Sequence, residues 1–145
     1  MENFSMDVQI RWSDMDPNFH LLHSVYYDWG AMCRVEFLNR FDFTADVMKQ
    51  NDLGPILLRE EAIFRREIRP GDKVTINLKA LKAKRDFSRL TFQHEIKKNG
   101  DTLSAILTVD IAWINTIKRK LTSLPEHLQK IFHEVPRAED FQWLD

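Results

Sequence analysis

Five stretches of the chain alternate apolar and polar residues, the pattern of strands with one buried face. They span Met6–Trp12, Ile56–Ile68, Lys73–Ala83, Phe87–Lys97 and Leu103–Ile114. Two turn sequences, Pro70-Gly71-Asp72 and Asn99-Gly100, lie between consecutive long stretches. Strands joined by such short turns predict an antiparallel sheet. The residues expected on its buried face include Val74, Ile76, Leu78 and Ala80; Leu90, Phe92, His94 and Ile96; and Leu103, Ala105, Leu107, Val109 and Ile111.

A helical period replaces the alternation between Ser24 and Asn39. The apolar residues that recur there form one broad stripe: Val25, Tyr26, Trp29, Met32, Cys33, Val35 and Phe37. Ser24 is a favourable N-cap residue for this helix. A short helix capped by Thr44 is expected next, and another is expected to open with Pro125 in its first turn. The tail after about residue 135 is expected to be loosely held.

The order of these elements, β-α-β-β-β-β, predicts an α+β fold with a curved antiparallel sheet wrapped around one long central helix. At 145 residues, the whole chain 1–145 is expected to be a single domain. One helix cannot cover both faces of such a sheet. The uncovered face and the sheet edges therefore predict an oligomer, most simply a symmetric homodimer.

Composition narrows the classes of function. A net charge of −1 gives no overall attraction to nucleic acid or to an anionic membrane, so neither is expected as a partner. No apolar stretch has the length of a membrane span, and the N-terminus lacks the apolar segment of a signal peptide. The one cysteine, Cys33, cannot form an intrachain disulfide. We therefore expect a cytoplasmic protein, with Cys33 as a small core residue rather than a nucleophile.

The candidate chemistry lies in the polar loop before the long helix, where Asp14, Asp16, His20 and His23 stand close together. Backbone N–H groups at a helix N-terminus lack partners and favour negative charge, so this is a place to stabilise an oxyanion. From the residues alone, Asp16 is best interpreted as an ordinary loop-capping residue. Asp14 is expected to be structural. His20 fits either proton transfer or a structural hydrogen bond. No metal site is expected, because the loop lacks a dense set of ligands.

Several short motifs, in this order and spacing, carry a family resemblance: Asp16-Pro17-Asn18-Phe19-His20 leading into Ser24-Val25-Tyr26, Arg34-Val35-Glu36-Phe37-Leu38, Pro70-Gly71-Asp72, and Leu124-Pro125. Between about Val8 and Phe132 the chain resembles hotdog-fold acyl-CoA thioesterases of the 4-hydroxybenzoyl-CoA thioesterase-like family. It departs from the common family pattern in the loop. The usual Gly is Phe19, and the two usual Asn positions hold Leu22 and His23.

The resemblance implies that the chain hydrolyses an acyl-CoA thioester as a homodimer or as a homotetramer built from two dimers. It implies that Asp16 is the catalytic carboxylate, acting as nucleophile or as the base for water, while the helix N-terminus polarises the thioester carbonyl. His20 and His23 are assigned to the catalytic site. Phe19, through its backbone N–H, and Ser24 are assigned to substrate binding. No cofactor is implied, since coenzyme A is part of the substrate.

A basic cluster around the junction of two predicted strands contains Lys84, Arg85 and Arg89, with Ser88 among them. These four residues are candidate contacts for the phosphates and pantetheine of CoA, although an ordinary charged hairpin explains them equally well. Two other functions remain open at this stage. One is a non-catalytic module that binds acyl-CoA or acyl-carrier protein, and the other is a hotdog-fold hydratase that adds water to an enoyl thioester.

Overall fold

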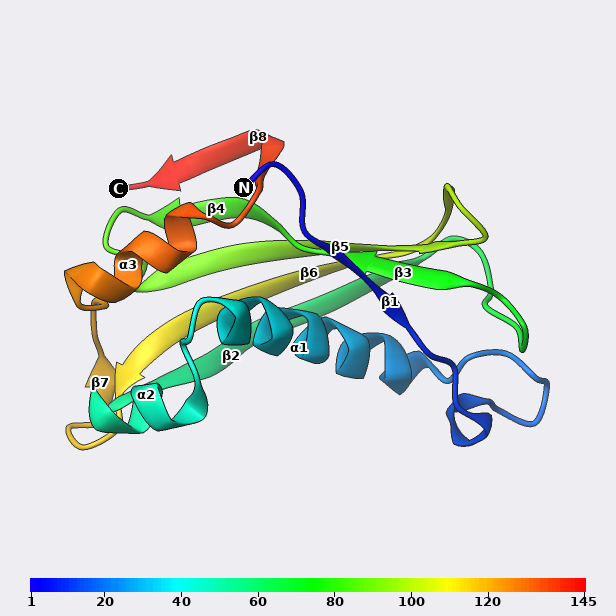
Figure 1. The fold of residues 1–145 in the computed structure, drawn as a ribbon, viewed down its shortest axis with the longest axis horizontal. Coiled ribbons are helices and arrows are strands. Elements are labelled where there is room, and N and C mark those ends of the chain that lie inside the picture. Colours follow the sequence, from blue (N-terminus) through cyan, green and yellow to red (C-terminus); the bar gives the residue numbers. More distant parts are fainter.

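The computed structural model describes residues 1–145 and contains one sheet and three α-helices. The eight strands are β1 (Ser5–Val8), β2 (Leu53–Phe64), β3 (Val74–Asn77), β4 (Lys79–Lys84), β5 (Arg89–Lys98), β6 (Thr102–Asn115), β7 (Lys120–Leu121) and β8 (Arg137–Leu144). The helices are α1 (His23–Arg40), α2 (Ala45–Gln50) and α3 (Glu126–His133), with a 3₁₀ turn, η1, at Trp12–Asp14. Figure 1 shows the long strands running the length of the molecule beside α1.

The predicted antiparallel sheet is confirmed, with one parallel pair added. β1, β3, β5, β4 and β8 are neighbours in that order, and β6 pairs with both β5 and β2. Only β4 and β8 run parallel. Asn99 and Gly100, at the β5–β6 hairpin, both have positive φ angles, 51° and 98°, as the Asn-Gly turn predicts. β2 pairs with β6 alone, which leaves one edge of β2 without a neighbouring strand.

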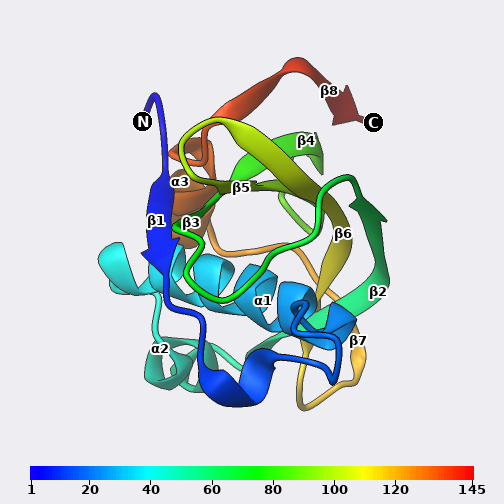
Figure 2. The same cartoon turned by 90° about the vertical axis from the view of Figure 1, so that its right-hand side faces the viewer.

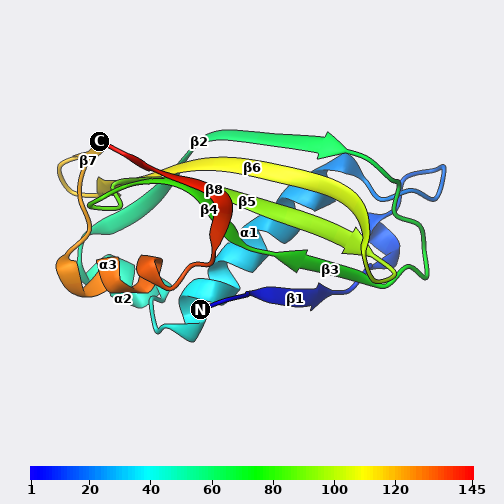
Figure 3. The ribbon, with the colours of Figure 1, turned by 90° about the horizontal axis from the view of Figure 1, so that it is seen from above.

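The sheet is curved, and α1, the longest helix, lies on its concave side (Figures 2 and 3). The side of α1 that packs against the sheet buries Val25, Trp29, Cys33 and Phe37. The predicted stripe was too broad, because Met32 and Val35 are 54% and 55% exposed. The buried face predicted for β3, β4, β5 and β6 is confirmed at every position except Leu103, which is half-buried. No helix is long and apolar enough to cross a membrane.

The first strand ends earlier than predicted. It stops at Val8, and Trp12, expected on a strand, begins η1 with 92% of its surface exposed. The cause is local: the Asp14 carboxylate accepts a hydrogen bond from the Arg11 N–H at 2.8 Å and turns the backbone out of the sheet. The stretch Lys73–Ala83 likewise divides into β3 and β4. Its pairing with β5 is interrupted at Asn77, whose side-chain oxygen accepts the N–H of Glu95 at 2.6 Å.

The starts of two helices differ from the sequence prediction. α1 begins at His23 with Leu22 as N-cap, so Ser24 lies inside the first turn and its side chain caps nothing. Pro125 is the N-cap residue of α3 rather than part of the first turn. The predicted cap of α2 is confirmed, since the Thr44 hydroxyl accepts from the N–H of Val47 at 3.4 Å.

The expectation of a loosely held tail is wrong for most of its length. Residues Arg137–Leu144 form β8, which adds a strand beside β4. Trp143 explains the attachment: its ring packs edge-on against Phe87 at 5.8 Å, and the Arg85 guanidinium lies 4.6 Å above it. This strand was not predicted from the sequence, because its polar and apolar residues do not alternate regularly.

Candidate functional site

Asp16 lies at the base of a tight loop that leads to α1. An isolated bridge between Met15 and Leu21 closes this loop, and the N–H of Asp16 donates to the carbonyl of His20 at 2.9 Å. The carboxylate oxygen Oδ1 of Asp16 accepts from the N–H groups of Asn18 at 2.8 Å and His20 at 3.0 Å. Oδ2 has no hydrogen-bond partner. The half-buried carboxylate therefore holds its own loop in shape with one oxygen and leaves the other oxygen available.

Phe19 occupies the turn of this loop with a left-handed φ of 58°, a conformation that costs a residue other than glycine about 1–2 kcal/mol. Its side chain is 67% exposed, and its N–H donates to the carbonyl of Asp16 at 3.0 Å. That N–H is thus occupied within the turn, and its role toward a substrate carbonyl stays a prediction.

The first turn of α1 offers backbone donors close to the loop in sequence. The N–H groups of His23 and Ser24 have no acceptor, and both residues are exposed. The N–H of Leu22 donates to the carbonyl of Asp14 at 2.8 Å, which ties the start of the helix to η1. Free N–H groups at the positive end of an 18-residue helix favour a developing negative charge there.

Asp14 has a structural role in the loop that carries Asp16. It is 2% exposed and forms an ion pair with Arg11 at 3.0 Å. Burial acts to raise the pKa of Asp14, but the hydrogen bonds and charge of Arg11 outweigh it and lower that pKa below its ordinary value. Asp14 therefore remains ionised and fixes the loop.

His20 does not contact the Asp16 carboxylate through its ring. Its Nε2 lies 2.9 Å from the Glu67 carboxylate, which also binds Arg69. Arg69 is the main cause of the lowered pKa of Glu67, and His20 adds to it. Glu67 was not predicted as part of the site, because 47 residues separate it from His20 in the sequence.

An open recess adjoins Asp16 on the surface. It is lined by Ile10, Arg11, Trp12, Ser13, Met15, Asp16, Pro17, Phe19, Pro70 and Gly71. Trp12 and Phe19 contribute exposed aromatic surface beside a carboxylate. Such a combination can pack against an apolar group and hold a reactive one.

The predicted basic cluster lies at the other end of the molecule. Figure 1 shows the β4–β5 turn at the opposite end of the sheet from the loop before α1. In this turn the N–H of Ser88 donates to Asp86 at 2.9 Å, Lys84 is half-buried, and Arg85 and Arg89 are exposed. A single chain does not bring these residues to Asp16.

A second site, which the sequence analysis missed, lies between α1 and the sheet. Arg34 Nη1 is 2.9 Å from Nε2 of the fully buried His94, whose Nδ1 is 2.8 Å from the carbonyl of Asn77. A carbonyl only accepts, so Nδ1 carries the proton and Nε2 accepts from Arg34. Burial, followed by the charge of Arg34, lowers the pKa of His94 to about 3, so the ring is neutral.

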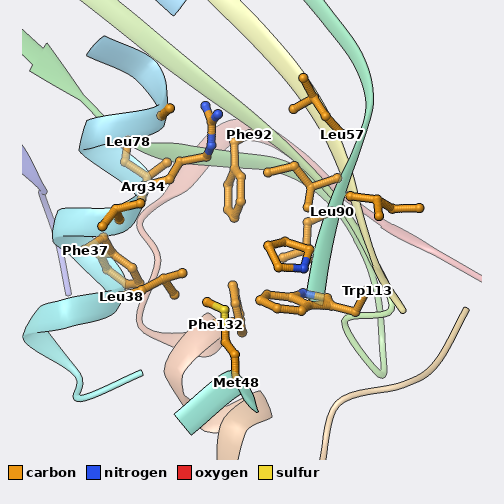
Figure 4. A pocket seen from close by; sticks show the side chains of 15 residues that line it. Arg34, Phe37, Leu38, Met48, Leu57, Leu78, Leu90, Phe92, Trp113 and Phe132 are labelled. Carbon is orange, nitrogen blue, oxygen red and sulfur yellow. The ribbon is translucent and has the colours of Figure 1, made fainter. Parts of the chain in front are cut away.

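Arg34 also lines an apolar cavity of about 230 Å³ (Figure 4). Of its 15 lining residues 13 are hydrophobic; they include Phe37, Leu38, Met48, Leu57, Leu78, Leu90, Phe92, Trp113 and Phe132. The signal for this site was present in the sequence as His94, a polar residue in the apolar alternation of its strand. Its partner on α1 could not be found without the fold.

Comparison with known families identifies the class of protein. Residues 10–132 match the model of the thioesterase-like superfamily, and the chain belongs to that superfamily. The hotdog-fold resemblance seen in the sequence is thereby confirmed. No curated protein matches the chain significantly.

Solved structures share the fold at low sequence identity. A hypothetical protein from Staphylococcus aureus in complex with CoA is 17% identical, with a TM-score of 0.86 over 99% of this chain and 89% of that chain. A 1,4-dihydroxy-2-naphthoyl-CoA thioesterase from Synechocystis is 17% identical, with a TM-score of 0.82 over 94% and 99%. A thioesterase from Thermus thermophilus, complexed with coenzyme A and Zn, is 22% identical, with a TM-score of 0.75 over 94% and 98%.

Proposed function

We propose that this protein hydrolyses an acyl-CoA thioester to a free acid and CoA, with Asp16 as the catalytic carboxylate. One observation carries the proposal: Asp16 uses Oδ1 to hold its loop and leaves Oδ2 unbonded, at the entrance to a helix whose first N–H groups are free. Membership of the thioesterase-like superfamily supports it, as do structural neighbours that contain CoA.

Two routes fit a carboxylate in this position. In the first, Asp16 attacks the thioester carbon, the C–S bond breaks, CoA leaves as a thiolate that takes up a proton, and water hydrolyses the resulting anhydride. In the second, Asp16 takes a proton from water as the water attacks the thioester carbon; the C–S bond then breaks, and the CoA thiolate takes up that proton. In both routes the oxyanion forms at the carbonyl oxygen, where the N–H groups of His23 and Ser24 stabilise it.

We further propose that the working unit is a homodimer joined along β2. This 12-residue strand has one unpaired edge and carries four exposed apolar side chains, Leu57, Leu58, Ile63 and Phe64. Such an edge is a template for pairing with a second copy. A two-fold axis there places opposite ends of the two sheets together, so the basic turn of one subunit approaches the Asp16 end of the other. Lys84, Arg85, Ser88 and Arg89 are then available to the CoA phosphates in trans.

The test is release of free thiol from a panel of short, long and aromatic acyl-CoAs, together with calorimetric binding of CoA. Turnover of at least one member supports hydrolysis. Binding of CoA without thiol release from any member would identify a non-catalytic acyl-CoA binding module. Hydration of crotonyl-CoA without thiol release would instead identify a hydratase.

The dimer has its own test in sedimentation velocity. Replacing Leu58 and Ile63 with lysine is expected to give monomers, while Ile117→Lys serves as the matched control. Ile117 is 73% exposed but lies outside β2, so this variant is expected to remain dimeric. A wild-type chain that sediments as a monomer at all concentrations would contradict the proposed interface.

A further inference from the structure

The apolar cavity contains one charged side chain, and that charge has no ion-pair partner. Arg34 has no carboxylate within salt-bridge distance, whereas six other basic side chains and the N-terminus each form at least one ion pair elsewhere on the chain. Its one side-chain bond is to the neutral ring of His94, which accepts a single N–H. A guanidinium has five N–H donors, so most of them remain free.

Arg34 is half-buried, and this environment disfavours its positive charge. Burial lowers the pKa of the Arg34 guanidinium, and the negative charge of Glu60 only partly offsets that effect. Glu60, on β2, is a carboxylate whose charge acts on Arg34, but it forms no ion pair with Arg34. An anion that enters the cavity would pair with the charge of Arg34 and accept hydrogen bonds from its free N–H groups.

The shape of the site defines the rest of the ligand. Figure 4 shows Arg34 at one end of the cavity and Met48 and Phe132 at the other, with Phe92 between them. Four of the lining residues are exposed in the single chain: Ala31 and Val35 on α1 and Pro55 and Leu57 on β2. A cavity of about 150 Å³ holds benzene, so 230 Å³ suits an apolar chain of roughly eight or nine carbons.

We propose that the cavity binds an apolar chain that carries a carboxylate, with the carboxylate on Arg34 and the chain toward Met48 and Phe132. His94 acts as a positioning residue, because its Nε2 accepts from Arg34 and holds the guanidinium at the end of the cavity. The fork of a guanidinium matches the two oxygens of a carboxylate. This inference names the acyl class for the hydrolysis proposed above and rests on that function only for the source of the carboxylate.

Two sources supply this chemistry. The carboxylate is either the distal group of a dicarboxylic acyl-CoA, which makes Arg34 a specificity residue, or the acid released by hydrolysis, which makes the cavity a product site. Both place the same group on the same guanidinium, and steady-state kinetics separates them.

Binding is tested first, without turnover, by calorimetric titration with octanoate and 1-octanol, which share a chain and differ in the charged head. The wild type is expected to bind octanoate about tenfold more tightly than 1-octanol. Arg34→Met is expected to remove the preference, and Arg59→Met, an exposed arginine of β2 outside the cavity, is expected to keep it. Equal binding of the two probes by the wild type, no binding of either, or a preference retained by Arg34→Met would overturn the inference.

A second variant keeps the test decisive if Arg34→Met does not fold. Glu60→Gln removes a carboxylate whose negative charge acts on Arg34, so this variant is expected to bind octanoate more tightly and to bind 1-octanol as the wild type does. Equal effects on both probes would contradict a carboxylate on Arg34.

The two sources are then compared with suberoyl-CoA and octanoyl-CoA. A kcat/KM about tenfold higher for suberoyl-CoA, lost in Arg34→Met, assigns the distal carboxylate. A preference for octanoyl-CoA with competitive inhibition by octanoate assigns the product. Octanoate binding that depends on Arg34, with no thiol released from either thioester, would remove the proposed hydrolysis and leave the carboxylate site standing.

Discussion

The protein is expected to lose stability as the pH falls from 7 to 5 because His94 is buried in its neutral form. The ring is fully buried, with Nδ1 donating to Asn77 and Nε2 accepting from Arg34. Protonation would place a second positive charge beside the guanidinium. The folded-state pKa is therefore about 3, while the unfolded chain has the ordinary value of 6.5. Between these values the unfolded state binds a proton that the folded state does not, so stability falls with pH.

The magnitude follows from the two pKa values. From pH 7 to pH 5 the unfolded chain takes up most of one proton at His94, and the free energy of unfolding falls by about 2 kcal/mol. The carboxylates with lowered pKa values, Asp14, Glu67, Asp72, Asp86 and Glu95, start from ordinary values of 3.8 or 4.5 and titrate below this window. The slope between pH 7 and 5 thus reports mainly on histidine.

Urea unfolding at several pH values, at one protein concentration, measures this effect. His94→Gln keeps an acceptor for Arg34 and cannot titrate, so this variant is expected to be less stable at pH 7 but to lose about 2 kcal/mol less than the wild type on going to pH 5. The same slope in both proteins would refute the argument that His94 is held neutral.

Three further predictions concern single residues. Gly30→Ala is expected to destabilise the fold by about 1–2 kcal/mol, because the new Cβ would lie 3.0 Å from Leu107 Cδ1 and 3.3 Å from Arg34 Nη1. This crowding is expected to outweigh the better helix propensity of alanine. Thermal unfolding measures the effect, and a higher Tm in the variant would contradict it. Asp14→Ala is expected to lower the free energy of unfolding by about 1–3 kcal/mol, because it leaves the N–H of Arg11 unpaired. Urea unfolding measures this change, and an unchanged midpoint would contradict a structural role for Asp14. Cys33 is fully buried, and burial raises the pKa of its thiol to about 12, so it is expected not to react with a thiol reagent until the protein unfolds; rapid labelling of the native protein would show otherwise.

Much of the fold could be predicted from the sequence because its elements have strong local signals. The alternation of β5 and β6 and the Asn-Gly turn between them determine their pairing without reference to other parts of the chain. β8 could not be predicted in this way. Its attachment depends on Trp143 meeting Phe87 and Arg85, which are distant in the sequence. Trp12 differs from the prediction for a local reason, because the Asp14 carboxylate accepts a hydrogen bond from the N–H of Arg11 and ends a strand that the hydrophobic pattern would continue.

In the candidate site, too, the features with a local sequence signal could be predicted and those that depend on distant residues could not. Asp16 and the helix after it are adjacent in sequence, so a local motif indicates both. The pairs His20–Glu67 and Arg34–His94 join segments 47 and 60 residues apart. A histidine in a sequence does not indicate which distant residue it will contact, so neither pair could be predicted. For the basic cluster the sequence indicates suitable chemistry but not its location, which is the far end of the same chain from Asp16. Only an assembly of two chains would bring them to Asp16.

Asp16→Asn tests the central claim most directly, because asparagine retains an oxygen at the Oδ1 position that can accept from Asn18 and His20 while it removes the carboxylate. Free thiol released from the best acyl-CoA of the panel is measured for the wild type and for this variant, after unfolding curves show that both are folded. We expect kcat/KM to fall by at least about 100-fold in the variant. Equal rates in the two proteins would remove Asp16 from the chemistry and contradict the account.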